Sequence, residues 1–373
     1  MSDRVLLLSG YDAASHKRWR QGLARYLDDF NFTQIALPPR HFSWRIRGNS
    51  LSFAGLHRES LTGSYHALIA TSMVDLSALR GMVPALAQLP TALYFHENQF
   101  AYPKSHRAHA SAEPQIVTLY SALCADQLVF NTAFNRDSFF DGAEQLLRRL
   151  PDLVPGGLVS ALRERTRIIP VLLEDRCFDL PARPVNDDGR VQVIWNHRWE
   201  YDKNPALLLR ALECLHTRFN GKLPFVLHVV GQSFRQIPAE FTAIRDLLRE
   251  ADALGQWGYL PAERYRELLA LSDIVLSSAD HDFQGLSVLE AVAAGATPVV
   301  PARQAYPEWF GAAACYPCTG ELEADATAFA DAIVARLDPA SRAAPVDVSR
   351  VQWARGGDQY RRLLLDLTAL HRL

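Results

Sequence analysis

The sequence lacks long apolar runs, a strong net charge and a cysteine-rich framework. Its first apolar run, residues 5–8, is far too short for a signal peptide or a spanning helix, and no later run approaches the roughly 20 residues that a span requires. The formal net charge of -2 gives no global reason to expect nucleic acid or an anionic membrane as a partner. We therefore expect a cytoplasmic protein with no membrane partner.

Cysteine is scarce, with five residues in 373, at positions 124, 177, 214, 315 and 318. An odd count in a large chain without a secretory signal favours free thiols. Cys315 and Cys318 form a Cys-x-x-Cys pair, but without a second pair or a nearby metal-type histidine, chance and core packing explain the spacing better than a zinc site. We expect no metal.

Two glycine signatures are missing as well. No Gly-x-Gly-x-x-Gly follows the first apolar run of either half, and no Gly-x-x-x-x-Gly-Lys-Ser/Thr occurs in the chain. The first absence argues against a nicotinamide dinucleotide and the second against a P-loop nucleotide site. We therefore expect no cofactor.

What the chain does contain is a repeated alternation of short apolar runs with helical periodicity. The expected strands are 4–10, 66–72, 91–97, 126–131 and 167–171, then 191–197, 224–231, 257–260, 272–278 and 297–302. The expected helices are 16–29, 75–88, 113–124 and 132–149, then 203–219, 239–253, 262–270 and 286–294. This pattern predicts an α/β protein with two Rossmann-like, doubly wound parallel sheets facing a central cleft.

A segment rich in proline, acid and glycine, residues 180–190, interrupts the alternation and reads as a linker. We place an N-terminal domain at 1–180 and a C-terminal domain at 181–347. The tail, 348–373, is expected to be a helix that is open to packing back on the N-terminal domain.

Ligands of such sheets bind beyond the carboxyl ends of the strands, so charged residues there are the first candidates. Arg198 and Lys203 follow the strand at 191–197, where positive side chains and free backbone N–H groups favour an anion such as a diphosphate. A solvated surface loop is the competing interpretation.

Two acids flank a second turn, with Asp282 before Gly285 and Glu290 in the helix after it. A carboxylate accepts hydrogen bonds from vicinal hydroxyls, and the free N–H groups of the turn suit a phosphate. A helix-cap acid and a surface glutamate are the competing interpretation, which the apolar neighbours of Glu290 weaken. Asp280-His281-Asp282 also imitates a metal-binding Asp-x-Asp, but the Asp282–Glu290 spacing explains the same residues with less coincidence.

In the N-terminal half, His96, Glu97 and Asn98 follow the strand at 91–97, where they are expected to project toward a ligand. His96 is a candidate to orient a sugar or acceptor hydroxyl, and Glu97 to act as a base or to hold a diol. A structural histidine bonded to backbone is the competing interpretation.

Basic residues of the same half alternate with aromatic rings, and residues 1–60 carry nine Lys/Arg against five Asp/Glu. Such a mixture neutralises phosphates and offers rings to unstacked bases, although an ordinary basic surface looks the same. The candidates for contact with an RNA acceptor are Arg40, His41, Trp44, Arg45 and Arg47, with His16 and Trp19 in a second cluster.

The residues Asn196-x-Arg198 with Lys203, and Asp282 eight residues before Glu290, resemble retaining glycosyltransferases of the two-Rossmann-domain, family 4 type, known as GT-B. The resemblance implies that the cations hold the donor diphosphate, Asp282 touches the donor sugar and Glu290 binds the nucleotide ribose, with front-face attack and no protein nucleophile. Asp282 stands where that family usually has glutamate. The predicted donor-binding residues are Asn196, Arg198, Lys203, Gly231, Asp282, Phe283, Gly285, Leu286 and Glu290, and the predicted catalytic residues are His96, Glu97, Arg198, Lys203 and Asp282.

Segments 37–48, 94–103 and 129–140 narrow the resemblance to the tRNA-queuosine mannosyltransferase family. This resemblance implies GDP-mannose as donor and, as acceptor, the cyclopentenediol of queuosine in a tRNA anticodon. Two alternatives stay open: a nucleotide-sugar-dependent transferase with a lipid-linked or small-molecule acceptor, and a non-catalytic RNA-binding relative.

Overall fold

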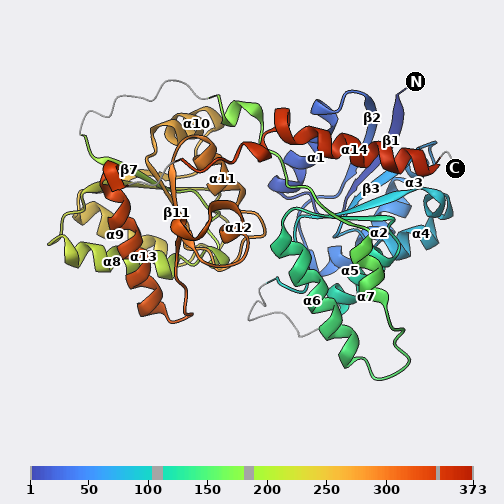
Figure 1. Cartoon of the computed structure of the whole chain (residues 1–373), viewed down its shortest axis with the longest axis horizontal. Coiled ribbons are helices and arrows are strands. Elements are labelled where there is room, and N and C mark those ends of the chain that lie inside the picture. The colour runs from blue at the N-terminus through green and yellow to red at the C-terminus, as the bar shows by residue number, and fades with distance from the viewer. Residues whose placement is uncertain (1, 103–111, 180–188, 342–344, 372–373) are drawn as a thin grey trace. The chain divides into compact units, whose positions relative to one another are not determined.

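The computed structural model describes residues 2–102, 112–179, 189–341 and 345–371, which divide into two compact units (Figure 1). Unit 1 runs to Leu172 and resumes at Trp353, and unit 2 comprises Leu173–Gln352. The division thus falls at Leu172 instead of residue 180, and the returning segment begins at Trp353 instead of residue 348. Most of the expected linker, 180–188, lies outside the described residues.

Unit 1 contains a six-stranded parallel sheet in the order β2-β1-β3-β4-β5-β6. The middle strands are buried on both faces, which explains why they read as nearly continuous apolar runs. The strands are β1 Asp3–Ser9, β2 Phe30–Ala36, β3 Ala67–Thr71, β4 Thr91–Phe95, β5 Gln127–Phe130 and β6 Thr166–Ile168. The helices are α1 Ala14–Tyr26, α2 Phe42–Leu56, α3 Arg58–Leu61, α4 Leu76–Met82, α5 Glu113–Leu123, α6 Ala133–Arg149, α7 Leu158–Glu164 and α14 Trp353–His371.

Unit 2 contains a second six-stranded parallel sheet, in the order β12-β11-β10-β7-β8-β9. Its strands are β7 Val191–Trp195, β8 Phe225–Val230, β9 Leu254–Gly258, β10 Ile274–Leu276, β11 Thr297–Pro301 and β12 Cys315–Tyr316. Its helices are α8 Pro205–Arg218, α9 Glu240–Glu250, α10 Ala262–Leu271, α11 Leu286–Ala293, α12 Tyr306–Phe310 and α13 Leu322–Leu337. The prediction of two doubly wound parallel sheets is therefore confirmed.

Several elements differ from the expected ranges. Strand β2 and helix α2 were not predicted, and β9 begins three residues before the expected strand at 257–260. The expected helix 75–88 ends at Met82, because Pro84 starts a separate 3-10 turn and proline cannot continue an α-helix.

The strand orders fix where each unit changes winding direction. In unit 1 the chain turns from one side of the sheet to the other at the β1/β3 pair, and in unit 2 at the β7/β10 pair. Ligands of open parallel sheets bind at the carboxyl ends of such strand pairs. The loops that follow β1, β7 and β10 are therefore the places where binding chemistry is expected.

Helix α14 comes from the C-terminus but belongs to unit 1, where Figure 1 shows it in red beside α1. Gly22 of α1 permits this approach, because a Cβ there would lie 2.7 Å from the Trp353 ring. In the core, the Tyr360 hydroxyl accepts from Trp19 Nε1 at 3.0 Å and donates to the Pro170 carbonyl at 2.9 Å. These bonds fasten α14 to unit 1.

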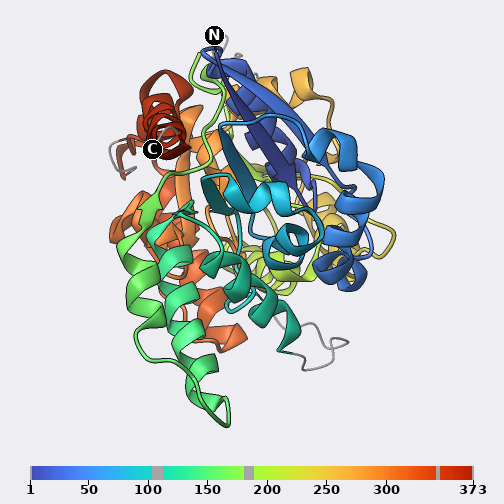
Figure 2. The ribbon, with the colours of Figure 1, turned by 90° about the vertical axis from the view of Figure 1, so that its right-hand side faces the viewer.

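Helices α6 and α7 pack against each other at one end of unit 1 (Figure 2).

Among the described residues, no helix is long and apolar enough to cross a membrane.

Substituting Tyr360→Phe removes the hydroxyl and leaves Trp19 Nε1 without its acceptor in a dry environment. Since an orphaned buried donor costs about 1–3 kcal/mol, we expect the free energy of unfolding to fall by that amount in urea titration. Tyr259→Phe, at a ring that is 72% exposed, is the matched control and is expected to change it little. Equal stability of the two variants would contradict the role assigned to the hydroxyl.

Candidate active site

The switch point of unit 2 brings together a buried lysine and a largely buried acid. Lys203 ends the turn after β7, and its Nζ lies 3.1 Å from Asp282 Oδ1 in the loop after β10. The same ammonium donates to the His281 carbonyl at 2.6 Å and lies 3.2 Å from Asp202. The Lys203 side chain thus ties the two loops together with its charge compensated.

The environment of Asp282 keeps its carboxylate ionised. Burial by itself would raise the pKa, but Lys203, His197 and the Tyr306 hydroxyl together lower it to about 2. His197, 3.9 Å from Asp282, is buried, and this burial lowers its own pKa to about 4. At neutral pH the pair is therefore a carboxylate beside an uncharged imidazole.

Tyr306 and Gly285 shape the turn around Asp282. The Tyr306 hydroxyl donates to Asp282 Oδ2 at 2.6 Å and lies 2.8 Å from Ser277 Oγ. Gly285, the residue before α11, has φ of 73°, and a Cβ there would lie 2.8 Å from the Tyr306 ring. Glycine is needed for both the backbone conformation and the space.

Arg198 supplies a second cation beside the first, in the loop after β7. Its guanidinium pairs with Glu200 and lies 3.7 Å from Asp202, and about half of its side chain is exposed. It is thus accessible to an anion, whereas Lys203 is buried and reaches Asp282.

Glu290 belongs to a hydrogen-bonded chain that crosses three elements. Asn196, which follows β7, donates through Nδ2 to the Tyr265 hydroxyl of α10 at 2.9 Å and to the Ser287 carbonyl of α11 at 2.8 Å. The Tyr265 hydroxyl in turn donates to Glu290 Oε2 at 2.9 Å. Glu290 is therefore a buried, bonded group of the site and not a surface acid.

The remaining predicted donor residues line the same loops. Gly231 follows β8 with φ of 154°, and a Cβ there would lie 1.8 Å from the His197 carbonyl oxygen, so only glycine fits. Phe283 is buried and Leu286 is half-buried at the start of α11. Arg198, Lys203, Asp282 and Glu290 are thus gathered at one switch point, as the sequence predicted, with their roles toward a ligand still predictions.

In unit 1 a second cluster forms where β4 ends. His16 of α1 stacks on His96 with ring centroids 3.9 Å apart, and its Nε2 lies 3.1 Å from Glu97 Oε2. Because the carboxylate accepts, Nε2 carries the hydrogen. His16 lies in the same cluster as His96 and Glu97, instead of on a basic surface.

The two imidazoles are buried, and two of their nitrogens, His16 Nδ1 and His96 Nε2, have no hydrogen-bond partner among the described residues. Burial, with a smaller effect of His16, lowers the pKa of His96 well below its ordinary value. His96 is therefore neutral near pH 7, and its Nε2 is available to a ligand hydroxyl.

Three predicted acceptor residues are buried in unit 1. Trp19 is only 1% exposed and stacks on Tyr94 in the core. The Asn98 amide is hydrogen-bonded within the protein, since Nδ2 donates to Asn135 Oδ1 at 2.8 Å and Oδ1 accepts from the Phe100 N–H at 2.9 Å. Arg45 is buried in α2. These three side chains are thus engaged in the interior of unit 1, and their predicted contact with an acceptor stays a prediction.

Arg40, His41 and Trp44 remain at the surface, at the start of α2. The Trp44 ring is 54% exposed and lies close to its own helix at Gly48, where a Cβ would come within 2.3 Å of it. Arg47 on the same helix donates to Asp75 at 3.0 Å, and it lines a hollow of about 540 Å³ with the Tyr120 ring.

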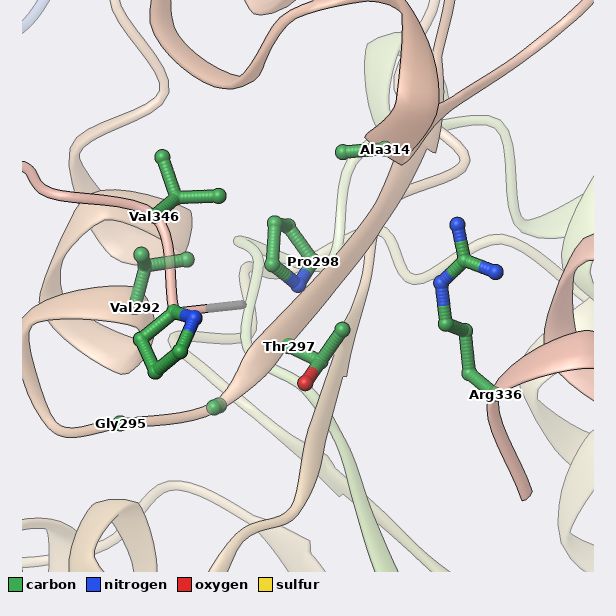
Figure 3. A pocket seen from close by; sticks show the side chains of 9 residues that line it. Val292, Gly295, Thr297, Pro298, Ala314, Arg336 and Val346 are labelled. Atoms are coloured by element: carbon green, nitrogen blue, oxygen red, sulfur yellow. The ribbon is translucent and has the colours of Figure 1, made fainter. Parts of the chain in front are cut away.

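A second cavity has no connection with either cluster. It measures about 40 Å³ and is lined by Thr297, Pro298 and Arg336 among others (Figure 3). Thr297 begins β11, so the cavity lies at the amino ends of the strands, whereas the Asp282 loop follows the carboxyl end of β10. It is also far smaller than the roughly 300 Å³ that ligand pockets usually offer.

Sequence reasoning missed three side chains of the unit 2 site: His197, Tyr265 and Tyr306. Tyr306 lies 24 positions after Asp282 and Tyr265 lies inside an ordinary helical pattern. No local signal marks them, because each contributes through a long-range hydrogen bond or charge contact.

Two family descriptions match the chain: "tRNA-queuosine alpha-mannosyltransferase N-terminal" over residues 4–173 and "Glycosyl transferases group 1" over residues 190–338. The tRNA-queuosine alpha-mannosyltransferase of Drosophila melanogaster is 32% identical over 311 residues, which cover 82% of this chain and 81% of that protein.

Solved structures resemble the fold at low sequence identity. Sucrose-phosphate synthase from Thermosynechococcus elongatus has a TM-score of 0.68 at 17% identity, with 98% of this chain and 99% of that chain covered. The E. coli trehalose-6-phosphate protein bound with UDP-2-fluoro glucose has a TM-score of 0.65 at 14% identity, with 99% and 97% covered. The likeness supports the GT-B fold.

Substituting Lys203→Met leaves Asp282 buried without its cation, so we expect the free energy of unfolding at pH 7 to fall by about 3–5 kcal/mol. Because the folded-state pKa of Asp282 is about 2, against 3.8 ordinarily, its stabilisation is present above about pH 4 and is lost as the pH falls toward 2. The difference between variant and wild type should therefore shrink over that range.

Urea titrations at several pH values measure this difference. Arg218→Ala, which breaks an exposed pair with Asp331, is the control and should cost less than about 1 kcal/mol. A difference for Lys203→Met that stays constant from pH 7 to pH 3 would contradict the pairing with Asp282.

Proposed function

The chain belongs to the tRNA-queuosine alpha-mannosyltransferase family, and on this premise we propose that it transfers mannose from GDP-mannose to the cyclopentenediol of queuosine in a tRNA anticodon. The observation that carries the donor half is the Lys203–Asp282 pair with Arg198 beside it at the switch point of unit 2. The acceptor half rests on the family, whose named relative spans most of both units.

On the donor side, Arg198 is the exposed cation that holds the diphosphate, the buried Lys203 adds its charge and fixes Asp282, and Asp282 accepts hydrogen bonds from the sugar. The glycosidic bond from the anomeric carbon to the phosphate oxygen breaks, and an acceptor hydroxyl oxygen takes its place on the same face. Negative charge then grows on the departing diphosphate, and the two fixed cations oppose it. The hydroxyl proton leaves with that diphosphate, and because the acceptor oxygen attacks the anomeric carbon directly, no protein nucleophile is required.

On the acceptor side, the cluster of His16, His96 and Glu97 suits a diol. Neutral His96 offers a buried Nε2 as an acceptor, and the Glu97 carboxylate accepts from a second hydroxyl. His16, bonded to Glu97 and stacked on His96, holds both side chains in place. We assign His96 and Glu97 to orientation of the attacking hydroxyl.

For the tRNA itself, the surface at the start of α2 offers Arg40 and His41 to phosphates and the Trp44 ring to an unstacked base. Arg47 and the exposed Tyr120 ring line a hollow large enough for a nucleotide base. These residues lie in unit 1, as the buried histidine cluster does.

The direct test is transfer of radiolabelled mannose from GDP-mannose to tRNA that carries queuosine, beside the same tRNA with unmodified guanine. We expect label on the queuosine tRNA alone, with kcat lowered about 10²–10³-fold by Arg198→Ala because a fixed cation is lost from the transition state. Arg210→Ala, a half-exposed arginine of unit 2 paired with Glu213 and Glu323, is the matched control and should retain activity.

Transfer of label to the queuosine tRNA from another nucleotide sugar, and not from GDP-mannose, would refute GDP-mannose as the donor and leave the proposed acceptor standing. Transfer to the guanine-containing tRNA would refute recognition of the cyclopentenediol.

The tRNA surface is tested separately with Trp44→Ala. Loss of one stacked base costs about 1–3 kcal/mol, so the Kd for tRNA should rise about 5- to 150-fold in fluorescence anisotropy. Leu56→Ala on the same helix, at another exposed apolar side chain, is the control. Arg40→Ala should instead reduce the slope of log K against log salt by about 1. Unchanged affinity in both variants would exclude α2 from the RNA contact.

A further inference from the structure

We propose that Tyr265 is a positioning residue for the donor nucleotide, and that it sets Glu290 and Asn196 to accept hydrogen bonds from the two ribose hydroxyls. The inference rests on the proposed function, because it assumes a nucleotide in the unit 2 site. Neither the sequence motif nor the family description singles out this tyrosine.

The direction of the hydrogen bonds follows from chemistry alone. The Asn196 amide nitrogen can only donate, so the Tyr265 hydroxyl accepts from it at 2.9 Å. The single hydroxyl hydrogen then goes to Glu290 Oε2, also at 2.9 Å. One phenol oxygen therefore links the Asn196 amide and the Glu290 carboxyl group, and the phenol donates its own proton to Glu290.

This arrangement matters because Glu290 is almost buried. Its exposed fraction is 6%, and its helix neighbours Val288, Leu289 and Ala291 are buried apolar side chains. A buried carboxyl group needs hydrogen-bond partners to offset its loss of water and to keep one rotamer. Tyr265 supplies one of them from a separate helix, α10.

Asn196 points to a ligand independently. Its side chain is more than nine-tenths buried, and Nδ2 is fully used by Tyr265 and the Ser287 carbonyl. Its Oδ1 is buried as well, yet it has no hydrogen-bond partner among the described residues. An orphaned buried acceptor costs stability, so a hydroxyl donor from a bound ligand would complete the site.

The chemistry of the missing partner is therefore a pair of hydroxyl donors. Glu290 and Asn196 Oδ1 are both acceptors, and both side chains are anchored within 2.9 Å of the same phenol oxygen. A vicinal diol matches two adjacent acceptors, whereas a phosphate carries no hydrogen to give at neutral pH. Ribose is the diol that a nucleotide brings to the carboxyl end of β7.

The test compares binding of GDP with binding of 2′,3′-dideoxy-GDP by calorimetry. We expect wild-type protein to prefer GDP about 5- to 150-fold, as loss of a buried hydrogen bond implies. Tyr265→Phe should reduce that preference toward unity by weakening GDP binding while the dideoxy compound binds almost as before. In turnover the KM for the nucleotide sugar should rise with kcat nearly unchanged, because the ribose contact is equal in ground and transition states.

Tyr316→Phe is the matched control, since it also removes a buried hydroxyl from unit 2, one that donates to the Ser277 carbonyl and touches neither Asn196 nor Glu290. It should keep the preference for GDP. Glu290→Gln is the second variant, and adding Tyr265→Phe to it should reduce the preference by less than Tyr265→Phe does in the wild type, because part of the effect of the tyrosine passes through the carboxylate.

Each outcome has a separate meaning. A full preference for GDP in Tyr265→Phe, or additive losses in the double variant, overturns the role of Tyr265. A wild-type protein that binds GDP and the dideoxy compound equally removes the ribose role of Glu290 as well, and with it that part of the proposed function. The same comparison is made with UDP and 2′,3′-dideoxy-UDP. A preference for UDP over its dideoxy form, without one for GDP, would mean that the base is wrong and the ribose contact is right.

Discussion

The ion pair between Lys203 and Asp282 is the constraint on which the organisation of unit 2 depends. Taking two charges out of water is costly, and only close pairing with further hydrogen bonds offsets that cost. The pair meets this condition by using the His281 carbonyl and the Tyr306 hydroxyl, which in turn fixes the loops after β7 and β10 against each other. Glycine at 285 then follows from the close approach of the Tyr306 ring, which binds Asp282, and burial keeps His197 neutral beside the pair.

The cluster of His16, His96 and Glu97 in unit 1 also lies at the carboxyl end of a parallel sheet, but its chemistry differs. The cluster carries one carboxylate, Glu97, but the neighbouring imidazoles are stacked and buried, which keeps His96 uncharged. A site with cations suits a diphosphate, whereas a site of one carboxylate and neutral imidazoles suits hydroxyl groups. The same β–α scaffold thus carries two clusters of different chemistry, since a shared fold does not dictate the chemistry of its sites.

Much of the fold was predictable because strands such as β3 and β4 are buried on both faces and read as plain apolar runs. Strand β2 lies at the sheet edge and is only partly buried, and α2 buries Asn49 and Ser50, so neither has a clear apolar period. Charged site residues at strand ends were predictable for the same topological reason. The places of Trp19 and Tyr265 were not predictable, because an aromatic residue of the core and one of a site cannot be told apart in the sequence alone.

The return of α14 to unit 1 has a consequence for synthesis on the ribosome. Residues up to Leu172 emerge first, yet their unit lacks the helix that covers Trp19 until everything after Trp353 has been made. Unit 2 is continuous in sequence and is complete before then. The N-terminal unit is therefore the last to finish folding, and loss of the final helix would damage the beginning of the protein more than its middle.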